Sequence, residues 1–167
     1  MAATTLIPLE EYLRTSYRPD RDYVDGELLE RNVGEEYHSY LQIEIGAYLI
    51  ARKKLWDIQA YSEQRVQVSA RRFRIPDICV TLGGRSSEQI FITPPYLCIE
   101  ILSKDDTMES MQERIDDYLN FGVPFVWIVN PRMRRGWVYT RERFEEARDG
   151  ILRAGVIEVP IPELFAE

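Results

Sequence analysis

Two carboxylates lie in segments that otherwise have the composition of buried strands. Asp77 follows Pro76 at the head of the apolar run 78–82, and Glu100 lies near the end of the run 96–102. Both runs are rich in residues that favour strands. An unpaired ionised carboxylate in such a setting costs several kcal/mol, and two neighbouring carboxylates disfavour each other's ionisation. Because one bound divalent cation would remove both penalties, the pattern indicates a metal site.

The spacing of the two runs is compatible with a shared ion. If the runs pair antiparallel with Asp77 opposite Glu100, then Cys79 falls opposite Cys98. Side chains alternate between the faces of a sheet, so both carboxylates would project from the same face. Directly opposite residues have Cβ atoms about 4.5–5.5 Å apart. We use this register as a hypothesis, selected because it brings the two carboxylates together.

Each carboxylate also has an explanation without a metal. Asp77 could cap a turn after Pro76, and Glu100 could form a buried ion pair with an arginine such as Arg74. A buried pair of this kind satisfies both charges without any ligand. Counting the family resemblance given below, we favour the metal at both positions. Ser103 and Asp106 are better explained as caps of a following helix than as chemical groups.

Composition limits the classes of function. The chain has 167 residues and a net charge of −7, with 45% hydrophobic residues. The length predicts one domain over residues 1–167, and the composition is that of an ordinary globular protein. The acidic balance argues against a protein that coats nucleic acid by bulk charge. A local basic rim for DNA is still possible, and the candidates are Arg71, Arg72 and Arg74; the alternative is that they are solvated turn charges.

Two further features bear on location and redox state. No apolar stretch is long enough to span a membrane, and the first eight residues lack the charged and apolar regions of a signal peptide. We therefore expect a cytoplasmic protein with no membrane partner. Both cysteines lie in apolar runs, which predicts reduced core thiols.

Periodicity and turn residues predict the order of elements. Helices are expected at 8–17, 35–54 and 107–121, the last ending near Gly122, and a short helical turn at 162–165. Asp25-Gly26 predicts a hairpin turn within 22–30. Strands are expected at 65–68, 77–82, 96–102, 125–129, 136–139 and 155–159. This order predicts an α/β or α+β fold.

An ordered set of short motifs resembles a known family. The set comprises Pro76-Asp77, 100–103, Arg114 with Tyr118, and 122–131, preceded by 23–27 and His38. Together these motifs are similar to the Uma-two putative restriction endonuclease family of the PD-(D/E)xK nuclease superfamily, over about residues 8 to 140. The resemblance implies a restriction-endonuclease-like core, with a central mixed sheet flanked by helices. It also implies cleavage of DNA that depends on Mg²⁺ or Mn²⁺, with Asp77 and Glu100 as metal ligands.

The chain departs from the superfamily at the lysine position. That residue usually lies two positions after the glutamate, where this chain has Leu102. In the family the lysine has moved to the following helix, and the matching residue here is Arg114. A guanidinium can stabilise developing negative charge but does not readily release a proton. The resemblance further implies supporting roles for His38 and Glu36, although a lone histidine is more often a helix-surface or core residue than a ligand.

Two other classes of function stay open at this point. The absent lysine and the low basic content favour a catalytically inactive nuclease fold that acts as an interaction or regulatory module. A metal-dependent hydrolase of a small phosphate ester is a weaker option. A homodimer is possible, because nucleases of this kind often need two sites to cut a duplex.

Overall fold

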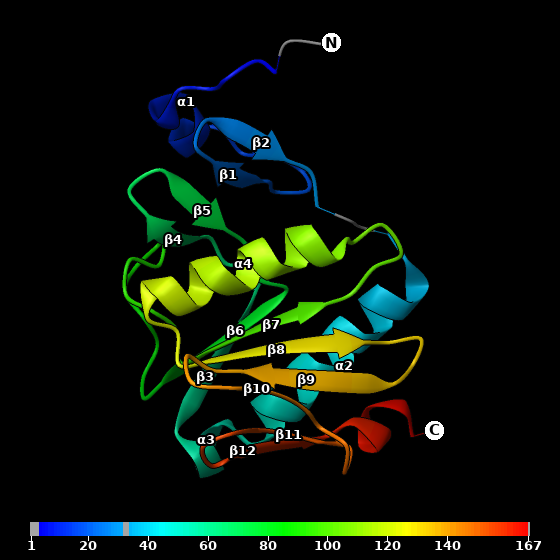
Figure 1. Cartoon of the computed structure of the whole chain (residues 1–167). Helices are drawn as coiled ribbons and strands as arrows, with labels where there is room; N and C mark the ends of the chain where they lie inside the picture. The colour runs from blue at the N-terminus through cyan, green and yellow to red at the C-terminus, as the bar shows by residue number, and fades with distance from the viewer. Residues whose placement is uncertain (1–3, 32–33, 167) are drawn as a thin grey trace.

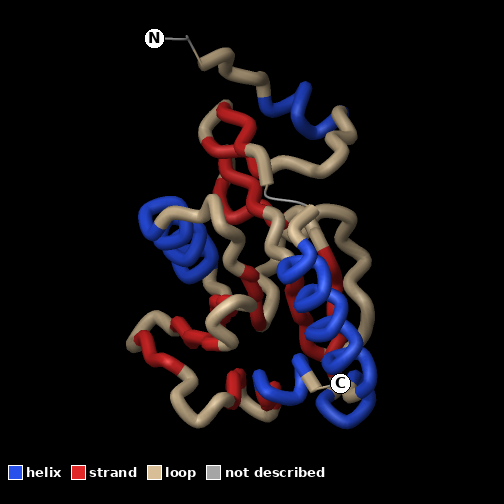
Figure 2. The backbone as a smooth tube through the Cα atoms, turned by 90° about the vertical axis from the view of Figure 1, so that its right-hand side faces the viewer, coloured by secondary structure: helices blue, strands red, loops and turns tan. Residues whose placement is uncertain are grey.

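A mixed six-stranded sheet forms the centre of the protein (Figure 1). The computed structural model describes residues 4–31 and 34–166. The sheet order is β10-β9-β8-β7-β6-β3, and helices α2 (Glu36–Ala51) and α4 (Met108–Phe121) lie on opposite sides of it (Figure 2). The strands are β3 (Ile58–Ser62), β6 (Ile78–Leu82), β7 (Leu97–Ile101), β8 (Phe125–Asn130), β9 (Arg135–Tyr139) and β10 (Phe144–Glu146). The predicted mixed α and β architecture is confirmed.

The register of the two central strands agrees with the hypothesis from the sequence. Strands β6 and β7 are antiparallel, with Cys79 opposite Cys98 and Ile78 opposite Ile99. One more step in this register places Asp77 opposite Glu100. The chain then passes through α4 and returns as β8, which pairs parallel to β7. A parallel pair needs such a crossover, and here the crossover brings α4 over the carboxylates.

Two smaller sheets complete the fold. The first has the order β2-β1-β5-β4 and comprises β1 (Asp22–Val24), β2 (Glu27–Leu29), β4 (Val66–Ser69) and β5 (Arg72–Arg74). Its predicted hairpin turn is confirmed, since Asp25 and Gly26 both have positive φ angles of 51° and 101°. The second pairs β11 (Ile151–Ala154) with β12 (Ile157–Pro160), followed by the 3₁₀ helix η1 (Ile161–Phe165).

The central sheet is buried on both faces. Ile78, Val80 and Ile99 pack toward α2 and the β11–β12 hairpin, whereas Cys79 and Cys98 pack toward α4. This alternation follows from the period of two along a strand. Both cysteines are free thiols. Within the described ranges, no helix has the length and apolar character needed to cross a membrane.

Several elements were not predicted or were misplaced. Strands β3, β5, β10 and β11 were missed, because each is short or carries too many polar residues to show a clear period. The expected helix 35–54 ends at Ala51 and a separate short helix, α3 (Lys53–Trp56), follows it. The first helix, α1 (Leu9–Arg14), is shorter than predicted. Thr107 caps α4 together with Ser110, so the prediction that Ser103 and Asp106 cap it is wrong.

Candidate active site

Asp77 is a buried carboxylate held by three donors. It lies just before β6 and is 3% exposed. Its Oδ1 accepts a hydrogen bond from Arg31 Nη2 at 2.8 Å, and its Oδ2 accepts one from the Ile101 backbone N–H at 2.7 Å. His38 Nε2 lies 3.2 Å from the same Oδ2. These partners come from the segment after β2, from β7 and from the first turn of α2.

The surroundings of Asp77 favour its ionised form. Burial alone would raise the pKa of this carboxyl, but the hydrogen bond from His38 and the charges of His38 and Arg31 outweigh burial and lower it. Burial likewise acts to lower the pKa of His38, and the bond to Asp77 reverses the effect and raises it. Asp77 is therefore held in its ionised form by the Arg31 guanidinium and by the hydrogen bond with His38.

Glu100 is buried to a similar degree but has weaker partners. Its Oε1 accepts a hydrogen bond from the Tyr118 hydroxyl at 2.6 Å, and Arg114 Nη1 lies 3.5 Å from Oε2. Burial raises the pKa of Glu100 to about 7; the charge of Arg114 opposes this rise and that of Asp77 adds to it. The positive charge nearest to Glu100 is thus farther from its carboxylate than the guanidinium of Arg31 is from that of Asp77.

The structure places Arg114, the residue that matches the family's displaced lysine, beside Glu100. Its guanidinium is largely buried on α4 and lies between Glu100 and Asp22, with Nε 3.8 Å from Asp22 Oδ2. Asp22 itself is 2% exposed at the start of β1. Its charge and that of Glu100 raise the pKa of Arg114 against the lowering effect of burial. Arg114 is a fixed cation beside the carboxylates.

Of the three arginines expected on a DNA-facing rim, Arg74 is not at the surface. It is 1% exposed, and its guanidinium contacts Asp22 and Asp117. The predicted surface position of Arg74 is therefore wrong, because two carboxylates hold it inside the protein. The same contacts mean that it does not form the ion pair with Glu100 that the sequence left open. Arg72 is partly exposed but contacts Asp25, Glu113 and Asp117. Arg71 is exposed in the β4–β5 turn.

The two supporting candidates on α2 have different positions. His38 is buried and reaches Asp77. Glu36 is exposed on the first turn of α2, and the structure does not bring it to the carboxylates. Gln42, one turn after His38, donates a hydrogen bond to the backbone carbonyl of Asp77 at 3.0 Å. Helix α2 thus fixes Asp77 through both its side chain and its backbone.

A cavity of about 10 Å³ opens beside Asp77. Its volume suits one water molecule or one cation. The residues that line it are Arg31, His38, Asp77, Ile101, Ser103, Asp106 and Arg114. Glu100 is not part of this lining and lies behind it, against Tyr118.

The donor set fits a hard divalent cation that keeps part of its water shell. An ionised carboxylate has about four lone-pair sites, and Asp77 uses three of them, which leaves a site on Oδ1. Glu100 accepts one hydrogen bond and has free sites on Oε2. In the described part of the chain, no three His, Cys, Asp or Glu side chains converge as a metal cluster. Two carboxylates with water and substrate oxygens are what Mg²⁺ commonly uses.

Sequence reasoning missed three residues of this site. Asp22 could have been found by the argument used for Asp77, since it is a carboxylate at the head of an apolar strand. Tyr118 was named only as part of the motifs that resemble the family. Arg31 gave no local signal, because its partner Asp77 is 46 residues away in the chain.

The chain is similar to known proteins in its sequence profile and in its fold. The sequence profile of the Uma2 family, described as "Putative restriction endonuclease", matches residues 9–159. Among solved structures, the chain is similar to "a putative nuclease belonging to DUF820 from Anabaena variabilis ATCC 29413", with a TM-score of 0.82 and 24% identity. The match covers 95% of this chain and 97% of that chain, and at this identity it shows the fold. Among curated proteins, no sequence matches significantly.

Proposed function

The chain belongs to the Uma2 family of restriction-endonuclease-like proteins, and on this premise we propose that it is a metal-dependent endonuclease that hydrolyses DNA phosphodiester bonds. The observation that carries the proposal is the pair of buried carboxylates, Glu100 on β7 and Asp77 immediately before the adjacent strand β6. Their pKa values are shifted in opposite directions, which is a feature of sites that do chemistry.

Asp77 and Glu100 would hold the ion, which is Mg²⁺ or Mn²⁺ by the preference of carboxylate oxygens. A backbone carbonyl near Ile101 would add a third protein ligand. When bound, such an ion activates a water molecule and neutralises charge on the scissile phosphate. The raised pKa of Glu100, to about 7, supports this role, because an added positive charge would favour its ionised form.

Side chains of the protein would stabilise charge on the phosphate, position Asp77 and contact the DNA. Arg114, close to Glu100, would stabilise the charge that develops on the phosphate, although it cannot serve as a proton donor or base at neutral pH. His38 and Gln42 position Asp77 through its side chain and backbone. Arg71 is the rim candidate whose side chain is exposed and could contact the DNA backbone.

A cleavage assay on plasmid and single-stranded DNA tests the proposal. Cleavage should require Mg²⁺ or Mn²⁺, stop in EDTA and be lost in Asp77→Asn. Mn²⁺ should also raise the melting temperature of the wild type, since a ligand of the folded state stabilises it, and Asp77→Asn should lose most of that shift. Asp57→Asn is a matched control, because Asp57 is exposed at the end of α3 and asparagine tolerates its positive φ of 51°. An unchanged Mn²⁺ shift in Asp77→Asn would reject the metal assignment.

Arg114 has a test of its own. Arg114→Ala should abolish cleavage and leave the Mn²⁺ shift largely intact, whereas Arg114→Lys should retain cleavage because an ammonium supplies a compact charge. The Mn²⁺ shift separates a loss of chemistry from a loss of the metal. Equal cleavage by the wild type and Arg114→Ala would reject the catalytic role of Arg114.

One observation favours a second function. The guanidinium of Arg31 already satisfies Asp77 Oδ1 at 2.8 Å, as in a structural ion pair. In that case the chain is a catalytically inactive interaction or regulatory module with the same fold. Absence of both Mn²⁺ affinity and cleavage selects this alternative over the nuclease.

A further inference from the structure

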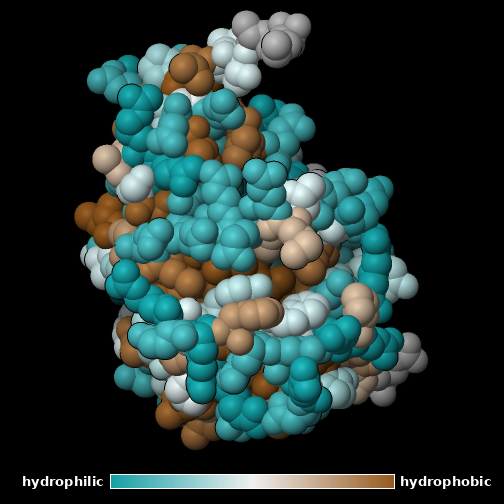
Figure 3. Space-filling model, in the orientation of Figure 1, coloured by the Kyte–Doolittle hydropathy of each residue, from teal (hydrophilic) through white to brown (hydrophobic). Residues whose placement is uncertain are grey.

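Helix α4 brings two polar side chains to Glu100. The outer side of the helix is exposed and carries Glu109, Gln112, Glu113 and Asp116. Figure 3 shows the mainly hydrophilic face of the molecule on which α4 lies. On its inner side, Met111 and Ile115 pack into the apolar core. Arg114 and Tyr118, one helical turn apart, also point inward, and both reach the Glu100 carboxylate.

The two side chains contact different oxygens of Glu100. The Tyr118 hydroxyl donates a hydrogen bond to Oε1 at 2.6 Å, whereas Arg114 Nη1 lies 3.5 Å from Oε2. A separation of 2.6 Å is that of a strong hydrogen bond to an ionised acceptor. Oε1 is therefore the oxygen that the protein engages directly, and Oε2 is the more available one.

Tyr118 is fixed through both its side chain and its backbone. The side chain is fully buried in the same apolar cluster as Cys98 and Ile115. Its carbonyl accepts hydrogen bonds from the backbone N–H groups of Gly122 and Val123 at 3.2 and 3.0 Å, where α4 ends. The hydroxyl cannot withdraw from Glu100 without leaving a buried polar group unpaired, which is unfavourable.

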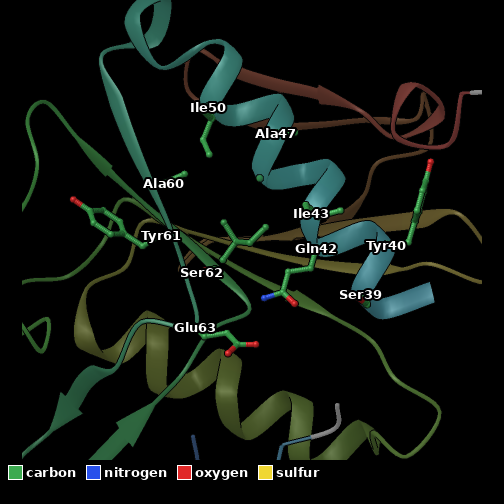
Figure 4. Close-up of a pocket in the computed structure, with 12 residues that line it drawn as sticks. Ser39, Tyr40, Gln42, Ile43, Ala47, Ile50, Ala60, Tyr61, Ser62 and Glu63 are labelled. Carbon is green, nitrogen blue, oxygen red and sulfur yellow. The ribbon is translucent and has the colours of Figure 1, made fainter. Parts of the chain in front are cut away.

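The large groove of the protein does not open onto Glu100. This groove, of about 690 Å³, lies between α2 and β3 (Figure 4). Its lining includes Ile78, which packs on the α2 side of the sheet, whereas Tyr118 packs on the α4 side. Neither Glu100 nor Tyr118 belongs to the lining of the small cavity beside Asp77. Among the described residues, the Tyr118 hydroxyl is thus the donor that holds Oε1.

Asp77 already has one oxygen fully engaged. Its Oδ2 accepts a hydrogen bond from the Ile101 N–H and lies 3.2 Å from His38 Nε2, while Oδ1 bonds to Arg31. Since each carboxylate oxygen has two lone-pair sites, a free site is left on Oδ1 alone. Glu100 is therefore the ligand whose number of available oxygens one hydrogen bond can change.

The number of available oxygens matters for the choice of cation. Ca²⁺ takes about 6–8 oxygen ligands and often binds both oxygens of one carboxylate. Mg²⁺ requires a nearly ideal octahedron, keeps several waters and is bound through one or two carboxylates, and Mn²⁺ accepts the same octahedral set. A site in which each of two carboxylates offers one oxygen suits Mg²⁺ or Mn²⁺ and leaves Ca²⁺ short of ligands.

We propose that the Tyr118 hydroxyl determines the cation preference of the candidate site, because it restricts Glu100 to one oxygen and so favours Mg²⁺ and Mn²⁺ over Ca²⁺. Tyr118 is a positioning residue, since it acts through Glu100 and not on the ion or the DNA. The inference rests on the metal site of the proposed nuclease and adds which cations that site rejects.

Competition between Mn²⁺ and Ca²⁺, followed by electron paramagnetic resonance of Mn²⁺, tests the proposal. The wild type should bind Mn²⁺ more tightly than Ca²⁺. Tyr118→Phe keeps the ring and removes the hydroxyl, so the ratio of the Ca²⁺ to the Mn²⁺ dissociation constant should fall by about tenfold.

Tyr12→Phe is the matched control. Tyr12 is also fully buried, and its hydroxyl donates a hydrogen bond to the Arg21 carbonyl at 2.8 Å, away from the carboxylates. The substitution removes an equivalent bond and should leave the ratio unchanged. Melting temperatures in EDTA verify that both variants are folded.

The outcomes separate this inference from the metal site itself. Equal ratios for Tyr118→Phe and the wild type overturn the inference alone, as does a wild type that binds Ca²⁺ as tightly as Mn²⁺. A wild type that binds neither cation rejects the metal site, and the inference with it.

Infrared spectroscopy of the wild type provides a test that needs no change at Tyr118. The separation of the two carboxylate stretching bands differs between binding by one oxygen and binding by both. With Mg²⁺, the bands that Glu100→Gln removes should have the separation of one-oxygen binding. A separation typical of binding by both oxygens would overturn the inference.

Discussion

At the scale of single residues, two neighbouring carboxylates have opposite electrostatic environments. Asp77 has Arg31 and His38 within hydrogen-bonding reach, and these partners lower its pKa despite burial. Glu100 has the more distant guanidinium of Arg114 and a neutral phenol, so burial dominates and raises its pKa to about 7. Pairs whose environments separate their pKa values are typical of acid and base assignments in active sites.

The raised pKa of Glu100 predicts a specific pH dependence of stability. The folded state keeps the proton up to a pH near 7, whereas an unperturbed glutamate loses it near 4.5. The folded state therefore binds more protons in this window, and the free energy of unfolding falls as the pH rises through it. In EDTA, the free energy of unfolding of Glu100→Gln should equal that of the wild type near pH 4.5. Above pH 7 it should exceed the wild-type value by about 1–3 kcal/mol.

Urea unfolding on both sides of this window measures the difference. Glu109→Gln is the control, because Glu109 is exposed on the first turn of α4. A marked loss of stability in Glu100→Gln at every pH would instead identify Glu100 as half of a structural ion pair with Arg114.

The contact between Arg31 and Asp77 leads to a prediction about the affinity of the site for Mn²⁺. The guanidinium of Arg31 occupies Asp77 Oδ1, and its Nη1 is buried without a hydrogen bond among the described residues. Removing it should free the carboxylate for a cation and destabilise the metal-free protein by about 1–3 kcal/mol, since a buried acceptor loses its partner. In Arg31→Gln the dissociation constant for Mn²⁺, measured by electron paramagnetic resonance, should fall by about tenfold.

The control for this experiment is Arg21→Gln. Arg21 forms a surface ion pair with Glu30, whose side chain is 80% exposed. Its substitution should change neither the stability of the metal-free protein nor the dissociation constant for Mn²⁺. Weaker Mn²⁺ binding by Arg31→Gln would mean that Arg31 supports the metal site rather than competing for it.

At the scale of elements, the site depends on three strands and two helices that meet at one end of the sheet. Asp77 lies just before β6 and Glu100 lies on β7. Helix α4 adds Arg114 and Tyr118, α2 adds His38, and β1 adds Asp22, which faces Arg114. Helix α4 begins at a capping box formed by Thr107 and Ser110 and ends at Gly122, whose φ is 110°. These local signals set the length of α4 and hence the height of Arg114 above the sheet.

Gly46 provides a prediction for α2. A methyl group there meets no atom within 4 Å of its own protomer, so Gly46→Ala should raise the free energy of unfolding by about 0.5–1 kcal/mol. The measurement is urea denaturation of Gly46→Ala and of the wild type at the same protein concentration. A loss of stability there would show that the position needs glycine for a reason within the protomer.

At the scale of the whole molecule, the charge distribution is unfavourable for tight DNA binding. The net charge is −7, and of the three predicted rim arginines, Arg72 and Arg74 are paired with carboxylates. Binding by phosphate contacts releases counterions, so its salt dependence reports the number of contacts. The acidic surface predicts few of them.

The slope of log K against log salt should therefore be shallow, no steeper than about −3 on duplex DNA. Arg71→Ala should reduce the slope by about 1, because it removes one exposed cation. Fluorescence anisotropy in EDTA, where no cleavage is expected, measures both slopes. If Arg71→Ala leaves the slope unchanged and a variant of Arg132 reduces it, the DNA contact lies at the β8–β9 turn and not at Arg71.

The sequence alone was sufficient for the central strands, the hairpin turn and α4, because each carries its signal within a few residues. Runs of apolar, strand-favouring residues identified β6 and β7, and the register selected to bring Asp77 and Glu100 together agrees with the observed pairing of Cys79 with Cys98. Short or polar strands such as β3 and β5 were missed, since their stability comes from neighbours in the sheet and not from their own pattern.

The tertiary structure alone decided which charges meet. Arg31 reaches Asp77 across 46 residues and Arg74 reaches Asp117 across 43, and neither pair has a local signature. The strength of an ion pair and the direction of a pKa shift depend on distance and burial, which the linear order of residues does not contain. The sequence therefore identified two carboxylates and offered one register that would join them, whereas the fold determined that Arg74 is buried, that Arg31 holds Asp77, and that the guanidinium of Arg114 lies 3.5 Å from Glu100.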